Sequence, residues 1–245
     1  MIKEWYNHSF YVKINMVKNM SLRFIYGKSG TGKTTYCFNE IKKLIYDNQK
    51  VYIITPEQFS FTAENNLMKI CDKKAVVNAQ VITFQRMAYR IINEIGGVVD
   101  NQITNTGKAM LLTSIIEKQK ENLNFLGKTD KNLDLTIRMI TELKKNNITI
   151  DMLEENIKNI EDKYLSSKLR DIILLYSEFN KEISNKYLDD DDLLTIVKDK
   201  IKESEMFEGS YIFIDEFAGF TKQEYGIIEE LLKIADEVNF FLFYF

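Results

Sequence analysis

An eight-residue segment near the N-terminus constrains the fold of this chain more than any other part of its sequence. Residues 27–34 read Gly-Lys-Ser-Gly-Thr-Gly-Lys-Thr, which matches the pattern G-x-x-x-x-G-K-S/T of a phosphate-binding loop. Residues 21–26 before the loop read as a buried strand, and apolar residues recur at helical spacing in residues 35–47 after it. This order predicts an α/β fold of the P-loop type, in which a nucleotide phosphate lies at a helix N-terminus.

The positions of this loop have expected roles in holding a nucleotide and its metal ion. The glycines let the chain wrap closely, so that backbone N–H groups can point at a phosphate. We expect Lys33 to reach the β- and γ-phosphates and to assist catalysis, and the Thr34 hydroxyl to complete the coordination of Mg²⁺. The candidate residues for binding ATP are Gly27, Lys28, Ser29, Gly30, Thr31, Gly32, Lys33, Thr34 and Thr35. A glycine-rich turn that binds nothing is the alternative interpretation.

A second motif, far along the chain, has the form of the acidic half of an ATP site. Residues 212–214 read Ile-Phe-Ile and end a predicted buried strand, and Asp215 and Glu216 follow directly. Asp215 would hold Mg²⁺ through water, and Glu216 would orient and activate the water that attacks the γ-phosphate. This pattern alone also fits a strand that ends in solvated acids. Beside a phosphate loop in the same predicted sheet, it favours ATP hydrolysis.

Composition limits the other kinds of site that the chain can form. The net charge of the 245 residues is −3, so charge alone gives no indication of a nucleic-acid partner. His8 is the only histidine, which excludes histidine-based acid–base catalysis and zinc sites. Cys37 and Cys71 match no metal-binding spacing and are interpreted as buried thiols. No apolar run before the last residues has membrane-spanning length and no signal peptide is visible, which indicates the cytoplasm.

The order of predicted elements divides the chain into three parts. Residues 1–19 lack a clear period and are expected to form an irregular leader. Residues 20–103 and 206–245 alternate strands with helices, which predicts one α/β domain with a parallel sheet. Residues 104–205 carry only helical periodicity, which predicts an all-helical insertion. The chain stops inside an apolar strand, so we expect it to be an N-terminal piece of a longer protein.

Two short segments resemble functional sites but have simpler interpretations. Asp189, Asp190, Asp191 and Asp192 form a run of carboxylates at the start of a predicted helix, where N-terminal capping is favoured over a metal site. Residues 105–108, Asn-Thr-Gly-Lys, lack the upstream glycines and the strand of a phosphate loop. A helix start is therefore expected at residues 105–108.

Several motifs occur in the order found in superfamily 1 helicases of the UvrD/RecB type, which the chain resembles over residues 20–245. Residues 81–91 are similar to the segment of these helicases that contacts single-stranded DNA. Residues 187–194 resemble the acidic segment before the second nucleotide motif, and residues 215–225 resemble the block that begins with Asp-Glu. The AddB (RexB) family, the B subunits of bacterial ATP-dependent helicase/deoxyribonucleases, is the most similar group, through residues 20–27, 55–61 and 219–225.

This resemblance implies a partner, a substrate and a set of DNA contacts. AddB subunits form a heterodimer with the helicase-nuclease subunit AddA, and the complex processes single-stranded and double-stranded DNA at double-strand breaks for recombinational repair. The helicase-like fold of AddB is expected to have lost translocation and to scan DNA for Chi-type recombination sequences. The implied DNA contacts are Thr55, Gln58, Thr83, Phe84 and Arg86. For Phe84, a core position at a helix start is an equally good interpretation.

The resemblance also implies how the domains and cofactors are divided. The α/β part would correspond to the RecA-like helicase domain 1A and the helical insertion to domain 1B. The nuclease module and the four cysteines of an iron–sulfur cluster lie far downstream in the family. Two unrelated cysteines cannot build that cluster, so the cofactors expected here are ATP and Mg²⁺.

Two departures from active helicases bear on the reaction. Residues 1–26 contain no glutamine for reading adenine, and Ala218-Gly219 stand where an active motor has Gln-Asp. Both fit a degenerate motor, whereas Glu216, which AddB relatives often lack, allows residual hydrolysis. An ATP-binding scaffold without turnover is one alternative. A small-molecule P-loop kinase is a weaker one, because the chain has few arginines to clamp a transferred phosphate.

Overall fold

The computed structural model describes residues 2–6, 9–16, 20–28, 30–71, 78–96, 102–126, 133–184 and 186–243. Ser29 of the predicted phosphate loop lies outside these ranges. The chain divides into two compact units. The α/β unit comprises residues 1–97, 196–220 and 224–245, and the helical unit comprises residues 98–195 and 221–223. An all-helical segment is thus inserted into the sequence of the α/β unit.

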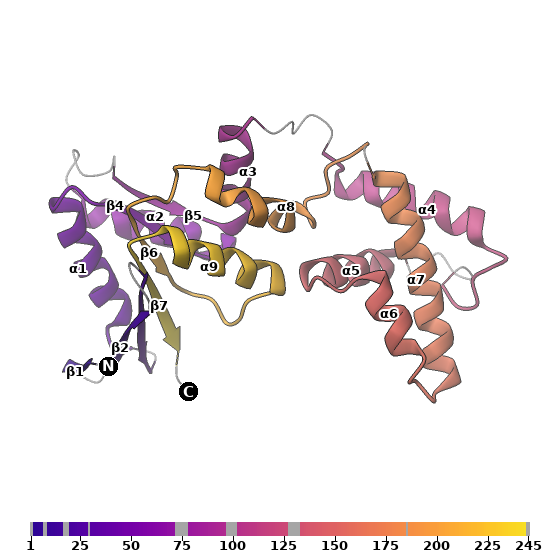
Figure 1. Cartoon of the computed structure of the whole chain (residues 1–245), viewed down its shortest axis with the longest axis horizontal. Coiled ribbons are helices and arrows are strands. Elements are labelled where there is room, and N and C mark those ends of the chain that lie inside the picture. Colours follow the sequence, from indigo (N-terminus) through magenta and orange to yellow (C-terminus); the bar gives the residue numbers. More distant parts are fainter. Residues whose placement is uncertain are drawn as a thin grey trace. The chain divides into compact units, whose positions relative to one another are not determined.

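A parallel β-sheet forms the centre of the α/β unit (Figure 1). Its strands, in spatial order, are β3 (Met20–Gly27), β7 (Glu237–Phe243), β6 (Ser210–Ile214), β4 (Lys50–Ile54) and β5 (Ala79–Ile82). Neighbours in this series pair in parallel, with Leu22 opposite Val238 and Ile54 opposite Ile214. Strands β4 and β6 are nearly continuous apolar runs, as expected for parallel strands covered on both faces. The prediction of an α/β fold with a parallel sheet is confirmed.

The N-terminal residues correct the prediction of an irregular leader. Strands β1 (Ile2–Tyr6) and β2 (Ser9–Met16) pair antiparallel with each other, and β2 pairs antiparallel with β3. They therefore extend the sheet beyond β3. Apolar residues at positions 10, 12, 14 and 16 alternate with Tyr, Lys and Asn, and this period of two is the signal for a strand that the sequence contains.

Helices connect the strands of the α/β unit. Helices α1 (Lys33–Tyr46), α2 (Glu57–Ile70) and α3 (Phe84–Glu94) follow β3, β4 and β5, while α8 (Leu193–Lys200) precedes β6 and α9 (Lys222–Ile234) follows it. Helix α1 turns Cys37, Ile41 and Ile45 toward the sheet, because these residues share one helical face. The apolar core that they join includes Ile25, Val51, Ile53, Phe213 and Phe241.

The two cysteines differ in their surroundings. Cys37 is 1% exposed, as predicted, and burial raises the pKa of its thiol well above the ordinary value. Cys71 is only half-buried, at the end of α2, so the prediction of a buried thiol is wrong there.

The helical unit packs α4 (Asn105–Gln119), α5 (Leu133–Lys145), α6 (Ile150–Ile157) and α7 (Lys163–Ile183) around an apolar core (Figure 1). The predicted helices of this region are confirmed. Helix α4 begins at the Asn-Thr-Gly-Lys segment, where Thr104 Oγ1 accepts a hydrogen bond from Gly107 N at 3.1 Å. Helix α7 begins at Lys163, where the Asp162 carboxylate caps it by accepting from the backbone N–H of Tyr164 at 2.8 Å.

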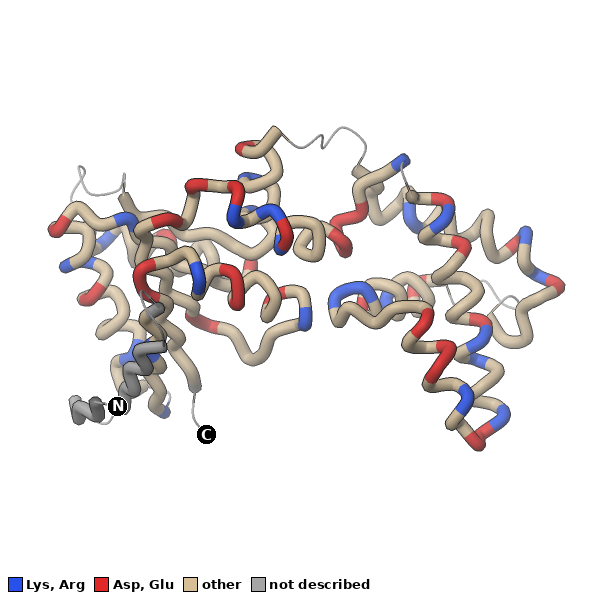
Figure 2. The backbone as a smooth tube through the Cα atoms, viewed as in Figure 1, with Lys and Arg blue, Asp and Glu red and all other residues tan. Residues whose placement is uncertain are grey.

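Charged positions of both signs are spread along the chain. Lys and Arg positions are interspersed with Asp and Glu positions along both units (Figure 2). Among the described residues, no helix combines the length and the apolarity needed to cross a bilayer. Any contact with DNA would therefore depend on a few local cations rather than on overall charge.

Candidate functional site at the carboxyl ends of the strands

The described residues between β3 and α1 include two glycines with positive φ, and the Lys33 side chain folds back onto the carbonyl groups at the start of this segment. Gly30 and Gly32 adopt φ values of +77° and +84°, which favour glycine because other residues are strained there. Lys33, the first residue of α1, is 5% exposed, and its Nζ donates to Gly27 O at 2.7 Å and to Lys28 O at 2.9 Å. Burial lowers the pKa of Lys33, against the opposing effect of the Asp215 and Glu216 carboxylates.

Asp215 and Thr55 stand side by side where β6 and β4 end. The two strands are parallel and in register, and Asp215 N donates to Ile54 O at 3.1 Å. Asp215 is 8% exposed, and burial followed by the neighbouring Glu216 charge raises its pKa to about 6. The Asp215 carboxylate accepts a hydrogen bond from Glu216 N at 2.9 Å but forms no ion pair with a described lysine or arginine. A buried carboxylate without a paired cation is the kind of ligand that fits a metal ion.

Aromatic rings hold the turn that carries Glu216. Glu216 has φ of +66°, a left-handed conformation that costs a non-glycine residue about 1–2 kcal/mol. The next residue, Phe217, meets Phe84 edge-on at 5.5 Å between ring centroids and lies 4.9 Å from the Phe220 ring. Phe220 in turn contacts Phe240 of β7 at 6.1 Å. Packing of these rings opposes the backbone strain and fixes the direction of Glu216.

A small cavity lies between α1, α2 and these strand ends. Its volume is about 30 Å³. Its apolar walls include Cys37, and its polar walls come from Thr34, Thr55, Thr62, Asn66, Asp215 and Glu216. Thr34 of the predicted phosphate loop and Asp215 of the predicted acidic motif thus line one space. The structure brings these two parts of the predicted metal site together.

The five candidate DNA contacts do not form one surface. Thr55 is 1% exposed in the cavity just described, and Thr83 is 5% exposed because its Oγ1 caps α3 by accepting from Arg86 N at 3.2 Å. Phe84 is 5% exposed in the aromatic cluster, which agrees with the core interpretation rather than with stacking on a base. Gln58 and Arg86 lie at the surface, and the Arg86 guanidinium contacts Glu57 at 2.9 Å and Glu64 at 3.3 Å. A DNA contact stays a prediction for all five residues, of which only Gln58 and Arg86 are exposed.

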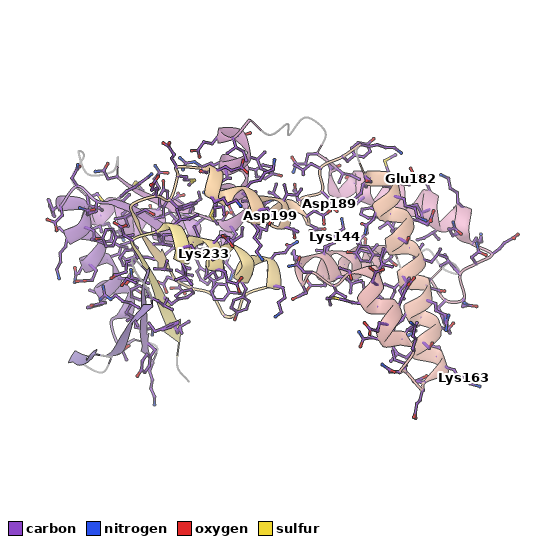
Figure 3. The ribbon with its side chains drawn as sticks, viewed as in Figure 1. Lys144, Lys163, Glu182, Asp189, Asp199 and Lys233 are labelled. Carbon is purple, nitrogen blue, oxygen red and sulfur yellow. The ribbon has the colours of Figure 1, made fainter. Side chains whose placement is uncertain are left out.

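The acidic run of the helical unit forms buried ion pairs, and capping of α8 by this run stays a prediction. Lys108 of α4 contacts Asp189 at 2.5 Å and Asp191 at 2.7 Å. Lys144 of α5 contacts Asp189 and Asp192, both at 2.6 Å, and Figure 3 shows Lys144 beside Asp189. Among the described residues, no group of histidine, cysteine and carboxylate side chains has the arrangement of a metal site. Three of the four carboxylates are therefore paired with lysines within the protein.

Sequence reasoning missed these lysines, although a signal for them exists. Lys108, Leu112 and Ile115 recur at helical spacing, and the latter two belong to the core of the helical unit. Lys144 likewise follows Ile140 by one helical turn. A lysine on an apolar face needs a buried carboxylate, and the run at residues 189–192 is the richest source of carboxylates in the chain.

Comparison with known proteins points to a single family. The family model described as "ADDB, N-terminal" matches residues 24–244. A protein of Clostridium tetani, named as the B subunit of an ATP-dependent helicase/deoxyribonuclease, is 45% identical over 228 residues, which cover 90% of this chain and 20% of that protein. Proteins of the same name from Clostridium botulinum (strain Loch Maree) and Clostridium acetobutylicum are each 42% identical over 225 residues, with the same coverage. The chain spans about a fifth of the length of these curated relatives.

Proposed function

Because the chain belongs to the AddB family and matches its N-terminal domain, we propose that it is the ATP-binding, helicase-like domain of the B subunit of a bacterial ATP-dependent helicase/deoxyribonuclease. The observation that carries the proposal is the convergence of the loop from Gly27 to Thr34 with Asp215 at the carboxyl ends of parallel strands. In open α/β sheets, ligands bind at these ends.

The residues present fit a nucleotide with Mg²⁺. Gly30 and Gly32 supply the backbone conformation in which N–H groups can face a phosphate. The Lys33 ammonium, which rests on the Gly27 and Lys28 carbonyls, would move to the β- and γ-phosphates. Thr34 and Asp215 would hold Mg²⁺, which when bound offsets negative charge on the phosphates.

Glu216 would orient and activate a water molecule for attack on the γ-phosphate. Its backbone is fixed by the aromatic rings of Phe84, Phe217 and Phe220, so the carboxylate would not need to reorganise during the reaction. Ala218 and Gly219 stand where active helicases carry Gln-Asp, which favours slow turnover and a motor that scans DNA without driving translocation.

We infer the partners of the whole protein from the family. The relatives are named as one subunit of an enzyme, which implies a partner subunit. That partner would be AddA, and the complex would resect double-strand breaks in the cytoplasm, with DNA as its substrate.

The test of the proposal compares ATP binding by the wild-type chain with ATP binding by Lys33→Ala. Isothermal titration with ATP and Mg²⁺ should show binding that Lys33→Ala weakens about 10- to 100-fold, because a hydrogen bond to a charged group is lost. Lys118→Ala is the matched control, because that side chain is 66% exposed and far along the chain from the loop. Equal affinities in wild type and Lys33→Ala would contradict the proposal.

Turnover separates a slow ATPase from a scaffold that only binds ATP. Phosphate release by wild type should exceed that of Glu216→Gln if Glu216 activates water. Equal release by the two proteins, with ATP binding intact, would instead support the scaffold.

A further inference from the structure

One polar side chain near the candidate site has no partner. Thr55 is 1% exposed, and its Oγ1 makes no hydrogen bond with any described residue. Burying a hydroxyl without a partner is unfavourable, and native proteins usually resolve such a case with ordered water. The side chain was expected to contact DNA, but burial removes it from the surface.

The cavity beside Thr55 has the size and polarity to hold water. A water molecule needs about 10–15 Å³ of such space, and the cavity volume of about 30 Å³ therefore suffices for about two. The cavity is also lined by Thr34, Asp215 and Glu216, which supply several polar groups. A buried water generally makes about three hydrogen bonds to such groups.

Thr55 is also fixed next to Asp215 by the sheet. The residues follow β4 and β6 directly, and these strands pair with Ile54 opposite Ile214. The hydrogen bond from Asp215 N to Ile54 O at 3.1 Å continues this pairing past the strand ends. Their side chains therefore start from adjacent points of the backbone and line the same cavity.

We propose that Thr55 holds a buried water molecule that links its hydroxyl to the Asp215 carboxylate. Thr55 is then a positioning residue for the metal site rather than a contact for DNA. Groups behind a metal ligand orient it, and their removal commonly lowers metal affinity by about 10- to 100-fold. The inference deepens the proposed function and rests on it, because Asp215 matters in this way only if the site takes Mg²⁺.

The test compares Thr55→Val, which removes the hydroxyl at almost constant shape, with Thr55→Ser, which keeps it. ATP affinity in Mg²⁺ should fall about 10-fold in Thr55→Val and stay near wild type in Thr55→Ser. ATP affinity in excess EDTA and the unfolding temperature of the nucleotide-free protein should not fall in either variant. Thr113→Val, at an exposed position of α4, is the control for the Thr-to-Val change itself.

A crystal structure of the wild-type chain tests whether the water molecule is present, independently of ATP binding. Density for a water within hydrogen-bond distance of both Thr55 Oγ1 and an Asp215 carboxylate oxygen is expected, and its absence would overturn the inference. A loss of ATP affinity in Thr55→Val that is equal in Mg²⁺ and in EDTA would also overturn it, as would a variant that binds Mg²⁺ and ATP normally. Insensitivity of ATP binding to Lys33→Ala is a different result: the proposed function fails, and the role toward the metal fails with it.

Discussion

Two sets of buried carboxylates, one in each unit, differ in how their charge is balanced. In the helical unit, Asp189 is 2% exposed and touches the ammonium groups of Lys108 and Lys144. Burial acts to raise the pKa of Asp189, but Lys144 and Lys108 outweigh it and hold the pKa below the ordinary value. In the α/β unit, Asp215 is similarly buried, and no ion pair to a described cation prevents its pKa from rising to about 6.

This contrast separates a structural acidic cluster from a candidate ligand site. Asp189, whose pKa two lysines hold below the ordinary value, has little free energy to gain from an added cation. A buried carboxylate that lacks a paired cation is less stable as an anion, and a bound metal ion would relieve that cost. The sequence predicts the same ranking, since Asp215 follows the strand of the second nucleotide motif whereas the four consecutive aspartates are interpreted as a helix cap.

The largest expected effect on stability comes from removing a buried lysine charge from the helical unit. Lys144→Met should lower the free energy of unfolding by about 3–5 kcal/mol, because Asp189 and Asp192 then lose a buried cation. The lysine also lies 5.3 Å above the Phe179 ring, so its stem packs in the core. Urea unfolding followed by circular dichroism near neutral pH measures the change.

A matched control keeps this prediction specific to the buried pair. Lys118→Met removes a lysine that is 66% exposed and whose ion pair with Glu182 is long, at 3.9 Å. Stability should therefore change by less than about 0.5 kcal/mol. If Lys144→Met were as mild as this control, the acidic run would not be held by its lysines, and the contrast between the units would be lost.

The next largest effect is the dependence of stability on pH, which has opposite signs for Asp215 in the α/β unit and Asp189 in the helical unit. The pKa of Asp215 is about 6 when folded against 3.8 in its ordinary state, so the folded protein binds the proton more tightly. Stability therefore falls as pH rises between these two values, by up to about 3 kcal/mol. Asp215→Asn has no charge to bury, so we expect it to be more stable than wild type by up to this amount above about pH 7.

The equivalent change in the helical unit should destabilise. The pKa of Asp189 is lowered, so its contribution to stability is present above its ordinary pKa and is lost as pH falls. Asp189→Asn should therefore be less stable than wild type near pH 7, and the two variants should diverge as pH rises from about 4. Urea unfolding across this range tests both, and a gain in stability from Asp189→Asn would refute the assignment of Asp189 as a balanced charge.

Local patterns were sufficient to predict the fold of the α/β unit. The apolar strands, the loop glycines and Asp215 each show in a short stretch of sequence, and parallel strands bring their carboxyl ends to one edge. Alternation in residues 9–16 is equally local, although the prediction of an irregular leader did not use it. The burial of Thr55 and Phe84 was harder to predict from local sequence. Their neighbours Asp215 and Phe217 come from a strand end and a turn more than 130 residues later.

The acidic run shows why the remainder could not be predicted in the same way. Asp189 and Lys144 lie 45 residues apart, and only the packing of α5 brings them together. Capping by aspartate is a local rule, whereas the ion pairs of these aspartates depend on lysines from α4 and α5. Whether a carboxylate is balanced is thus a property of tertiary structure, which periodicity within one helix does not report.

The smallest expected effect compares two buried polar side chains, one bonded to protein groups and one whose hydroxyl bonds to no described residue. Gln223, 4% exposed, donates from Nε2 to Asp191 O at 2.7 Å and to Thr195 Oγ1 at 2.9 Å. Gln223→Met should cost about 1–2 kcal/mol because it leaves the Asp191 carbonyl without this donor, whereas Thr55→Val should cost nothing or stabilise. The exposed Gln58→Met is the control and should stay within about 0.5 kcal/mol of wild type. If Thr55→Val cost as much as Gln223→Met in urea unfolding without ligand, the Thr55 hydroxyl would be bonded to a protein group, and the contrast between these two side chains would be lost.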